Sequence, residues 1–146
     1  MTSTSPSALG ASGGGKPVPV PRGEERAWFD AARDGKLALT RCRACGVRSV
    51  VRVVCPACWS TDVETVAARG TGVVYSYTVL HRAGRPGFEA DVPYVVALIE
   101  LPEGPRVMTN VVDCDPADVR IGMLVRLVID TRDDISFPQF APERQE

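Results

Sequence analysis

Histidine, long apolar runs and an excess of either charge are all scarce in this sequence. It has one histidine among 146 residues, a net charge of −1 and an isoelectric point near 5.9. Its apolar runs are short β-branched segments, far below the roughly 18 residues that a membrane-spanning helix needs. The N-terminus also lacks the basic stretch and following apolar stretch of a secretory signal. We therefore expect a cytoplasmic protein without membrane contact and without general attraction to nucleic acid.

The scarcity of histidine also limits the catalysis that can be expected. His81 follows a run of strand-forming residues, and strict alternation places it on the same face as Tyr75, Tyr77 and Val79. We interpret it as a strand-end residue with a partly packed ring. A general base is the alternative, although no carboxylate or nucleophile is close to it in sequence. His81 is also a candidate partner- or ligand-binding residue. Because no triad, phosphate-binding glycine loop or working pair of carboxylates is evident, we predict no catalytic residues.

Four of the five cysteines form two C-x-x-C pairs, Cys42 with Cys45 and Cys55 with Cys58. Two such pairs supply the four thiolates of a tetrahedral zinc site, and four protein ligands leave no open position for catalysis. A redox dithiol needs one C-x-x-C pair near a βαβ unit, and this sequence has two such pairs. Iron bound by the same four thiolates remains a chemical alternative to zinc. Cys114 stands alone and is interpreted as a small buried or half-buried hydrophobe rather than a nucleophile, because the one histidine is far from it in sequence. The pattern predicts one structural zinc in a reducing compartment.

A basic segment surrounds these cysteines. Between residues 36 and 58 there is no acid, and the five cations are Lys36, Arg41, Arg43, Arg48 and Arg52. They could offset the formal −2 charge of a zinc tetrathiolate and otherwise face solvent. They could also form an anion site for the phosphates of a nucleotide-bearing cofactor or of nucleic acid. Arg41, Arg43 and Arg48 are therefore candidate binding residues, with both interpretations open.

Composition and periodicity divide the chain into five segments. In order, they predict a disordered tail (1–22), an N-terminal helix (23–36), a zinc ribbon (37–68), a β-barrel (69–133) and an extended segment lying against the body (134–146).

The predicted helix has an unusually aromatic face for its length. Trp28, Ala31 and Ala32 recur at helical spacing, with Phe29 beside them. This face could pack on the chain's own barrel, or Trp28 and Phe29 could contact a partner or ligand. The sequence leaves these two interpretations open.

Strand-like periodicity begins at Gly70. Four β-branched or aromatic runs are separated by turn segments, with no helical stretch between them; these runs are GTGVVYSYTVLHR, VPYVVALIEL, RVMTNVV and MLVRLVID. Such spacing predicts a mainly β fold with a small antiparallel barrel or sandwich.

The order of these motifs resembles a known family. In sequence they are a helix, CRACG and CPACWS, RGTGVVYSYTVLHR, DVPYVVALIEL, TNVVDCDPADVRIGM and FPQFAPE, over about residues 24–142. The family consists of proteins with a rubredoxin-like zinc ribbon and a C-terminal OB-fold, linked to acyl-CoA metabolism. The resemblance implies an accessory subunit that scaffolds a thiolase-fold or enoyl-CoA-hydratase-like enzyme and helps to hold the acyl-CoA, while the partner supplies the catalytic residues.

Two other functions compete with this expectation. Zinc ribbons and OB-folds are also common in nucleic-acid-binding proteins. However, residues 70–130 contain five arginines and eight acidic residues, which makes nucleic acid an unlikely ligand of the barrel. An independent enzyme is the third alternative, and it requires acid–base chemistry that the sequence does not show.

Overall fold

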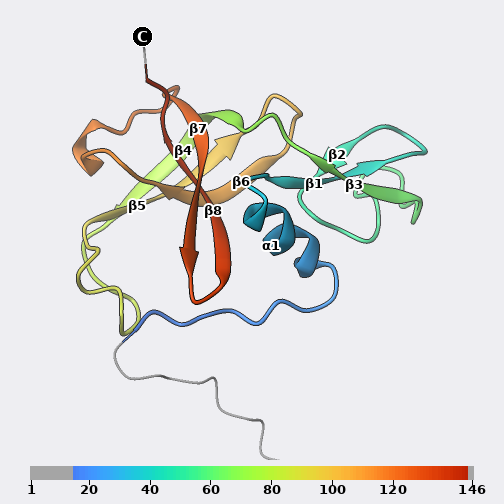
Figure 1. Ribbon diagram of the computed structural model, residues 1–146. Coiled ribbons are helices and arrows are strands. Elements are labelled where there is room, and N and C mark those ends of the chain that lie inside the picture. Colours follow the sequence, from blue (N-terminus) through green and yellow to red (C-terminus); the bar gives the residue numbers. More distant parts are fainter. Residues whose placement is uncertain (1–14, 145–146) are drawn as a thin grey trace, which may run out of the picture.

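The computed structural model describes residues 15–144 and contains one short α-helix, one 3-10 helix (Pro116–Asp118) and two β-structures (Figure 1). The first β-structure is a three-stranded sheet of order β2-β1-β3, and the second is a closed barrel of order β4-β5-β6-β8-β7. The sheet comprises β1 (Ala38–Cys42), β2 (Arg48–Ser49) and β3 (Val63–Ala67). The barrel comprises β4 (Thr71–Leu80), β5 (Tyr94–Glu100), β6 (Arg106–Val111), β7 (Leu124–Arg132) and β8 (Ile135–Pro142). The predicted mainly β fold is confirmed.

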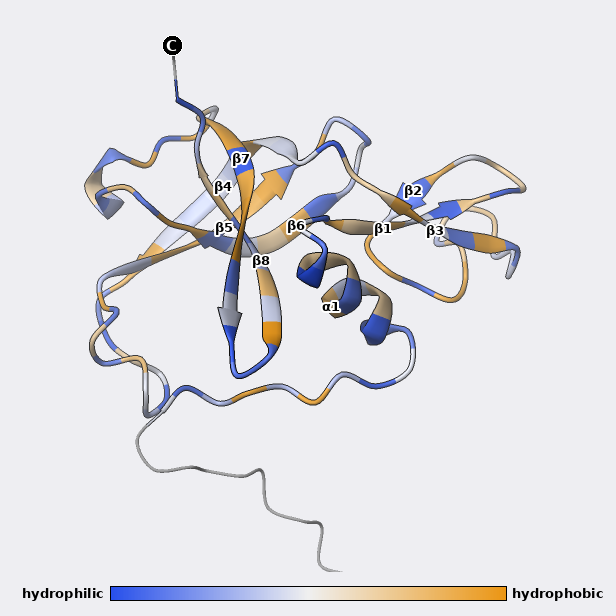
Figure 2. Ribbon diagram, viewed as in Figure 1, coloured by the Kyte–Doolittle hydropathy of each residue, from blue (hydrophilic) through white to orange (hydrophobic). Residues whose placement is uncertain are grey.

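Alternating side chains build the barrel core. Apolar residues occur along all the barrel strands (Figure 2), and buried residues alternate with more exposed ones along β5 and most of β8, as expected when one face of a strand points inward. The largest buried side chain is that of Phe140, and it packs with Ile99, Val74 and Val125. Leu37 and Leu39, at the start of the three-stranded sheet, belong to the same cluster. The ribbon is therefore anchored in the barrel core rather than tethered by a free linker.

Strand β4 contains a β-bulge that changes which side chains face inward. Its register with β5 shifts between Val74 and Ser76, so Tyr75 is an extra residue. Tyr77 and Val79 pack against the core, whereas Tyr75 is 46% exposed and lies under the guanidinium of Arg106. Strict alternation was therefore wrong in placing Tyr75 on the face of Tyr77.

Helix α1 (Glu25–Arg33) lies beside the barrel and contacts mainly β8, with β1 and β7 also in contact (Figure 1). Ala32 is completely buried, because small side chains allow close approach to the sheet. Trp28 packs against the barrel core, and the ring of Phe29 meets that of Phe137 edge-on at a centroid distance of 6.0 Å. Helix α1 thus packs on the chain's own barrel.

The C-terminal segment differs from its prediction. Residues 134–146 were expected to be an extended segment outside a barrel ending at 133, but Ile135–Pro142 forms barrel strand β8. It pairs along its whole length with β7 and at one position, Val111 with Phe140, with β6. The intervening turn is made by Asp133 and Asp134, both with positive φ, a conformation that aspartate tolerates.

The N-terminal segment also differs from its prediction where it is described. Of the predicted disordered tail, residues 1–14 lie outside the described part of the chain. Residues 15–22 run from the β4–β5 loop to α1, and Lys16 forms an ion pair with Asp91 and lies over the ring of Phe88 (Figure 1). Prolines in this stretch reduce the conformational entropy that the segment loses on ordering. The few contacts of Lys16 can therefore hold the segment against the barrel. Among residues 15–144 no helix is both long and apolar enough to cross a membrane.

Candidate functional site

The four cysteines of the two C-x-x-C pairs meet at one point in the ribbon. All four sulfur atoms lie within 4.8 Å of one another. The Cys42–Cys58 and Cys45–Cys55 sulfur pairs are each 3.6 Å apart. A zinc tetrathiolate with Zn–S bonds of about 2.3 Å has sulfur–sulfur edges of ~3.8 Å, whereas a disulfide requires ~2.05 Å. The donor set therefore fits one tetrahedral zinc ion.

Backbone geometry prepares each pair for a metal. Gly46 donates its N–H to the carbonyl of Cys42 at 2.8 Å, and Trp59 donates to the carbonyl of Cys55 at 3.0 Å. Both residues have positive φ, +78° for Gly46 and +65° for Trp59. They occupy equivalent positions, one residue after the second ligand of each pair. The two turns are thus built alike although one uses glycine and the other tryptophan.

Backbone hydrogen bonds to sulfur favour the thiolate form of Cys42 and Cys55, whereas burial and hydrogen bonds among the thiols raise the pKa of Cys45 and Cys58. The backbone N–H groups of Cys58 and Ala57 point at Cys55 and lower the pKa of its thiol to about 6, despite the opposing effect of burial. The Ala57 nitrogen lies 3.4 Å from that sulfur. A backbone N–H of Cys45 likewise lowers the pKa of Cys42. Both buried cysteines are therefore predisposed to bind zinc, since the deprotonated sulfur is the ligand.

The basic residues of the ribbon are partly neutralised by β3. Arg41 lies 2.9 Å from Glu64, and Arg43 lies 3.2 Å from Asp62 and 3.3 Å from Glu64. Hydrogen bonding from Arg41 and the charge of Arg43 lower the pKa of Glu64. Two of the three predicted anion-binding arginines are thus engaged within the ribbon. Arg48 is exposed, and no carboxylate among residues 15–144 forms an ion pair with it.

The aromatic residues of α1 also line a groove. Besides packing inward, Trp28 and Phe29 border a pocket of about 540 Å³ whose other apolar walls include Val51 and Met108. Met108 is 72% exposed, which is unusual for its type. The inner side of the helix therefore packs on the chain's own barrel, and its outer side is the part that could contact a partner or ligand. Whether the outer side binds a partner or ligand stays a prediction.

His81 is exposed and follows the end of β4. Among the described residues, no hydrogen bond or ion pair to its ring is formed. Its position fits a strand-end residue more closely than a general base, which needs an orienting partner.

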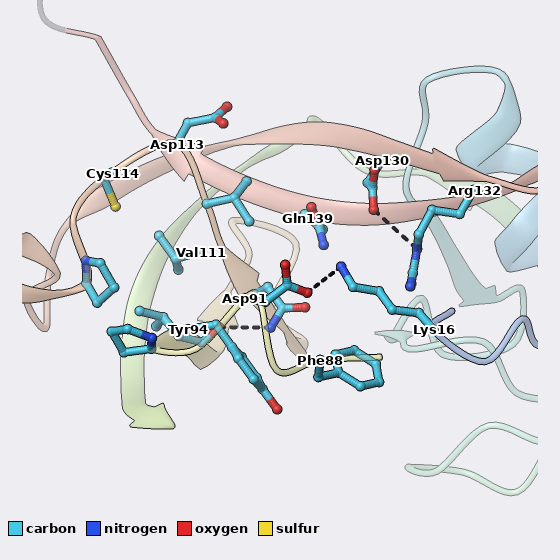
Figure 3. A pocket seen from close by; sticks show the side chains of 15 residues that line it. Lys16, Phe88, Asp91, Tyr94, Val111, Asp113, Cys114, Asp130, Arg132 and Gln139 are labelled. Atoms are coloured by element: carbon cyan, nitrogen blue, oxygen red, sulfur yellow. Dashed lines mark hydrogen bonds and ion pairs between the residues drawn. The ribbon is translucent and has the colours of Figure 1, made fainter. Parts of the chain in front are cut away.

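A second pocket, of about 590 Å³, was not predicted from the sequence (Figure 3). It lies where the ends of β5 and β6 meet β7 and β8, and it is closed on one side by the N-terminal segment. Its polar side chains form two ion pairs, Lys16 with Asp91 and Arg132 with Asp130 at 3.4 Å (Figure 3). The Nε and Nη1 atoms of Arg132 are nevertheless buried without a hydrogen-bond partner among the described residues. Its walls come from distant parts of the chain, so no local motif marks it.

Cys114 lines the same pocket and is half-buried. Burial raises the pKa of its thiol, and the charges of Asp118, Asp113 and Asp115 act in the same direction. A thiol held protonated is a poor nucleophile. The interpretation of Cys114 as a small apolar residue agrees with this environment.

Comparisons with known proteins agree with both halves of the fold. Residues 29–64 match the ChsH2 rubredoxin-like zinc ribbon domain, and residues 65–130 match the ChsH2 C-terminal OB-fold domain. The predicted zinc ribbon, with four cysteines able to bind one zinc ion, and the predicted OB-fold barrel are confirmed.

Three curated relatives are informative. A probable enoyl-CoA hydratase alpha subunit of Thermomonospora curvata is 43% identical over 129 residues, covering 87% of this chain and 40% of the relative. The chain therefore spans less than half of that protein. A DUF35 domain-containing scaffold protein of Methanocaldococcus jannaschii is 43% identical over 105 residues, covering 70% of this chain and 74% of the relative. The benzoylsuccinyl-CoA thiolase subunit BbsA of Geobacter metallireducens is 34% identical over 85 residues, or 56% of either chain.

A solved structure extends the similarity to three dimensions. A chain of the Ltp2-ChsH2(DUF35) aldolase is 42% identical and superimposes with a TM-score of 0.76. The match covers 86% of this chain and 98% of that one.

Proposed function

This chain belongs to the ChsH2 and DUF35 family of zinc-ribbon and OB-fold proteins, and we propose that it is a non-catalytic scaffold subunit of an acyl-CoA-processing enzyme. The partner would be a thiolase-fold or hydratase-like enzyme that supplies the catalytic residues. We place this assembly in the cytoplasm, because a four-thiolate site needs reduced cysteines.

The observation that carries the proposal is the match to a chain of the Ltp2-ChsH2(DUF35) aldolase, which is covered almost completely at 42% identity. Relatives named as subunits of a hydratase and a thiolase support the same class of partner. Both relatives are named after enzymes that act on CoA thioesters, which supports acyl-CoA as the substrate of the assembly.

The chemistry of the chain agrees with a scaffold. Four thiolates close the coordination sphere of zinc, so the metal has no position for water or substrate. When bound, zinc would cross-link the two turns of the ribbon and stabilise that fold. Cys114 is kept protonated and His81 has no orienting partner among the described residues, so neither is equipped as a nucleophile or base.

Fewer arginines are available to bind acyl-CoA than the sequence suggested. Arg41 and Arg43 are paired with Glu64 and Asp62, so two of the three arginines predicted to bind an anion are already engaged. We propose that this chain contributes at most a peripheral contact to the nucleotide and that the partner encloses the reacting thioester.

The proposal is tested by co-expression with a thiolase-fold enzyme encoded beside this chain. We expect a stable complex by size-exclusion chromatography, thioester turnover by the complex, and no turnover by the purified chain alone. Turnover of acyl-CoA by the isolated chain, or a partner that is fully active and never co-elutes with it, would contradict a scaffold role.

A further inference from the structure

Trp59 occupies a position for which its side chain is poorly suited. Its φ of +65° lies in the left-handed region that bulky residues rarely adopt. The equivalent residue of the other zinc turn is Gly46, which adopts this conformation without steric cost. The fold therefore requires a left-handed residue here but does not require tryptophan.

The indole of Trp59 contributes little to the fold itself. The residue is 81% exposed, the highest value among the exposed large hydrophobic residues of the described chain. A large aromatic in a strained conformation, with almost no internal contact, stabilises nothing within the isolated chain. Strain of this kind is retained where the side chain serves a function.

The ribbon segment that leads to Trp59 carries exposed apolar and cationic residues. Val53, two residues before the second cysteine pair, is 57% exposed. Arg52 and Val53 line a shallow depression together with Thr61, which follows Trp59 by two residues. Glu24, Ala27 and Glu64 line other parts of this depression, but neither carboxylate forms an ion pair with Arg52. Arg48 stands directly opposite Arg41 across the β1–β2 ladder, a like-charge arrangement that is destabilising unless compensated. Arg41 is compensated by Glu64 on its other side, whereas Arg48 and Arg52 have no ion pair within residues 15–144.

We propose that this ribbon end, defined as Arg48, Arg52, Val53 and Trp59, docks on a protein whose surface has an apolar slot for the indole bordered by carboxylates. Charge complementarity determines this choice of partner, because Arg48 and Arg52 are not neutralised within the described chain and would pair with acidic groups. The exposed side chains of Trp59 and Val53 would be buried in the apolar slot. The inference rests on the proposed function, since the partner is the enzyme that the chain scaffolds. The three-stranded sheet extends away from the barrel (Figure 1), so the ribbon can contact a partner beside the barrel.

A nucleic acid is the less favoured occupant of this surface. Arginine and tryptophan can stack on bases, but binding a phosphate backbone needs a track of uncompensated cations. Here Arg41 and Arg43 are neutralised, and the barrel beyond is rich in acidic residues.

The first experiment follows Trp59 directly. The chain has two tryptophans, so Trp28→Phe leaves Trp59 as the only indole fluorophore. In the free chain its emission should be that of a solvated indole, readily quenched by acrylamide. In the complex with the thiolase-fold enzyme the emission should shift to the blue and quenching should fall severalfold. Unchanged quenching in a complex that forms normally would overturn the inference and leave the proposed function intact.

The second experiment compares variants by isothermal calorimetry against the same enzyme. Trp59→Gly should raise the Kd about thirtyfold, or ~2 kcal/mol, as expected for a central aromatic anchor. Arg48→Glu should weaken binding and reduce its salt dependence, whereas Ile121→Ala, a change at a 72% exposed residue of the barrel, should leave the Kd within twofold. A Trp59→Gly chain that binds like wild type would overturn the inference, and absence of any complex with the wild-type chain would instead count against the proposed function.

A third measurement separates docking from a structural role. The Tm of isolated Trp59→Gly, with zinc bound, should equal or exceed that of wild type, because glycine removes the left-handed strain. A Tm several degrees lower would show that the indole supports the fold. Tight binding of single-stranded DNA by the wild-type chain, abolished by Trp59→Gly, would assign the surface to nucleic acid. Either result would overturn the inference.

Discussion

At the scale of single residues, Gly72 shows how closely β4 and β5 approach one another. A Cβ atom on Gly72 would overlap the side chain of Ile99 and lie 3.1 Å from the carbonyl oxygen of Glu100. Both neighbours belong to the barrel wall, so neither can move freely.

We predict that Gly72→Ala lowers the free energy of unfolding by about 1–3 kcal/mol through this overlap. Gly84 lies in open space with no atom within 4 Å of an added Cβ, so Gly84→Ala should change stability by no more than about 0.5 kcal/mol. Urea unfolding of the two variants and wild type provides the measurement. Equal stabilities would mean that β4 and β5 are farther apart than described.

The cysteines give a second residue-scale prediction. Replacing Cys42 or Cys58 by serine should remove zinc and most of the folded protein, because each supplies one of four thiolates that must act together. Cys114→Ser should do neither, since its sulfur lies in a different pocket. Metal analysis with thermal melts measures both effects. Well-folded wild-type protein without zinc would refute the site.

At the scale of elements, the barrel depends on β8. Phe140 from this strand is the largest fully buried side chain, and Phe137 lies on the opposite face, where it contacts Phe29. We predict that Phe140→Ala destabilises the protein by about 3–5 kcal/mol and Phe137→Ala by less than half of that. Chemical denaturation followed by circular dichroism is the check, and similar losses for the two variants would contradict the assigned faces.

The helix, the zinc ligands and the strands from β4 to β7 could be predicted because each rests on a local pattern. Strand β8 could not, since Pro138 and Pro142 argue against a strand that pairs on both sides. They are tolerated because β8 is joined to β6 at only one position. The pair Asp133–Asp134 could have indicated a hairpin between β7 and β8, because aspartate tolerates the two consecutive positive φ values that a two-residue turn needs.

The candidate site was predicted where its residues are close in sequence and missed where they are not. The cysteine spacing alone identifies the zinc ligands. The charge of the ribbon was overestimated, since Asp62 and Glu64 lie just outside the basic segment and fold back onto Arg41 and Arg43. The bulge at Tyr75 depends on pairing with β5, which no pattern within β4 contains.

At the scale of the whole molecule, charge distribution argues against nucleic acid as the main ligand. We predict that fluorescence anisotropy with single-stranded DNA at physiological salt detects at most weak binding, which declines steeply as salt is added. A basic OB-fold protein of known affinity serves as the positive control. Submicromolar affinity at that salt would reverse the choice between a scaffold and a nucleic-acid-binding module.

The late position of β8 also has a consequence for synthesis. The ribbon is complete once β3 ends at Ala67, whereas the barrel cannot close before Pro142 has been translated. At typical elongation rates, the roughly 75 residues in between take about 4–15 s. During that interval the nascent chain already presents all four thiolates, while β4 to β7 form at most an open sheet with an unprotected edge. Zinc can therefore be captured on the ribosome, and cells short of zinc would release chains that must order the ribbon and close the barrel at the same time.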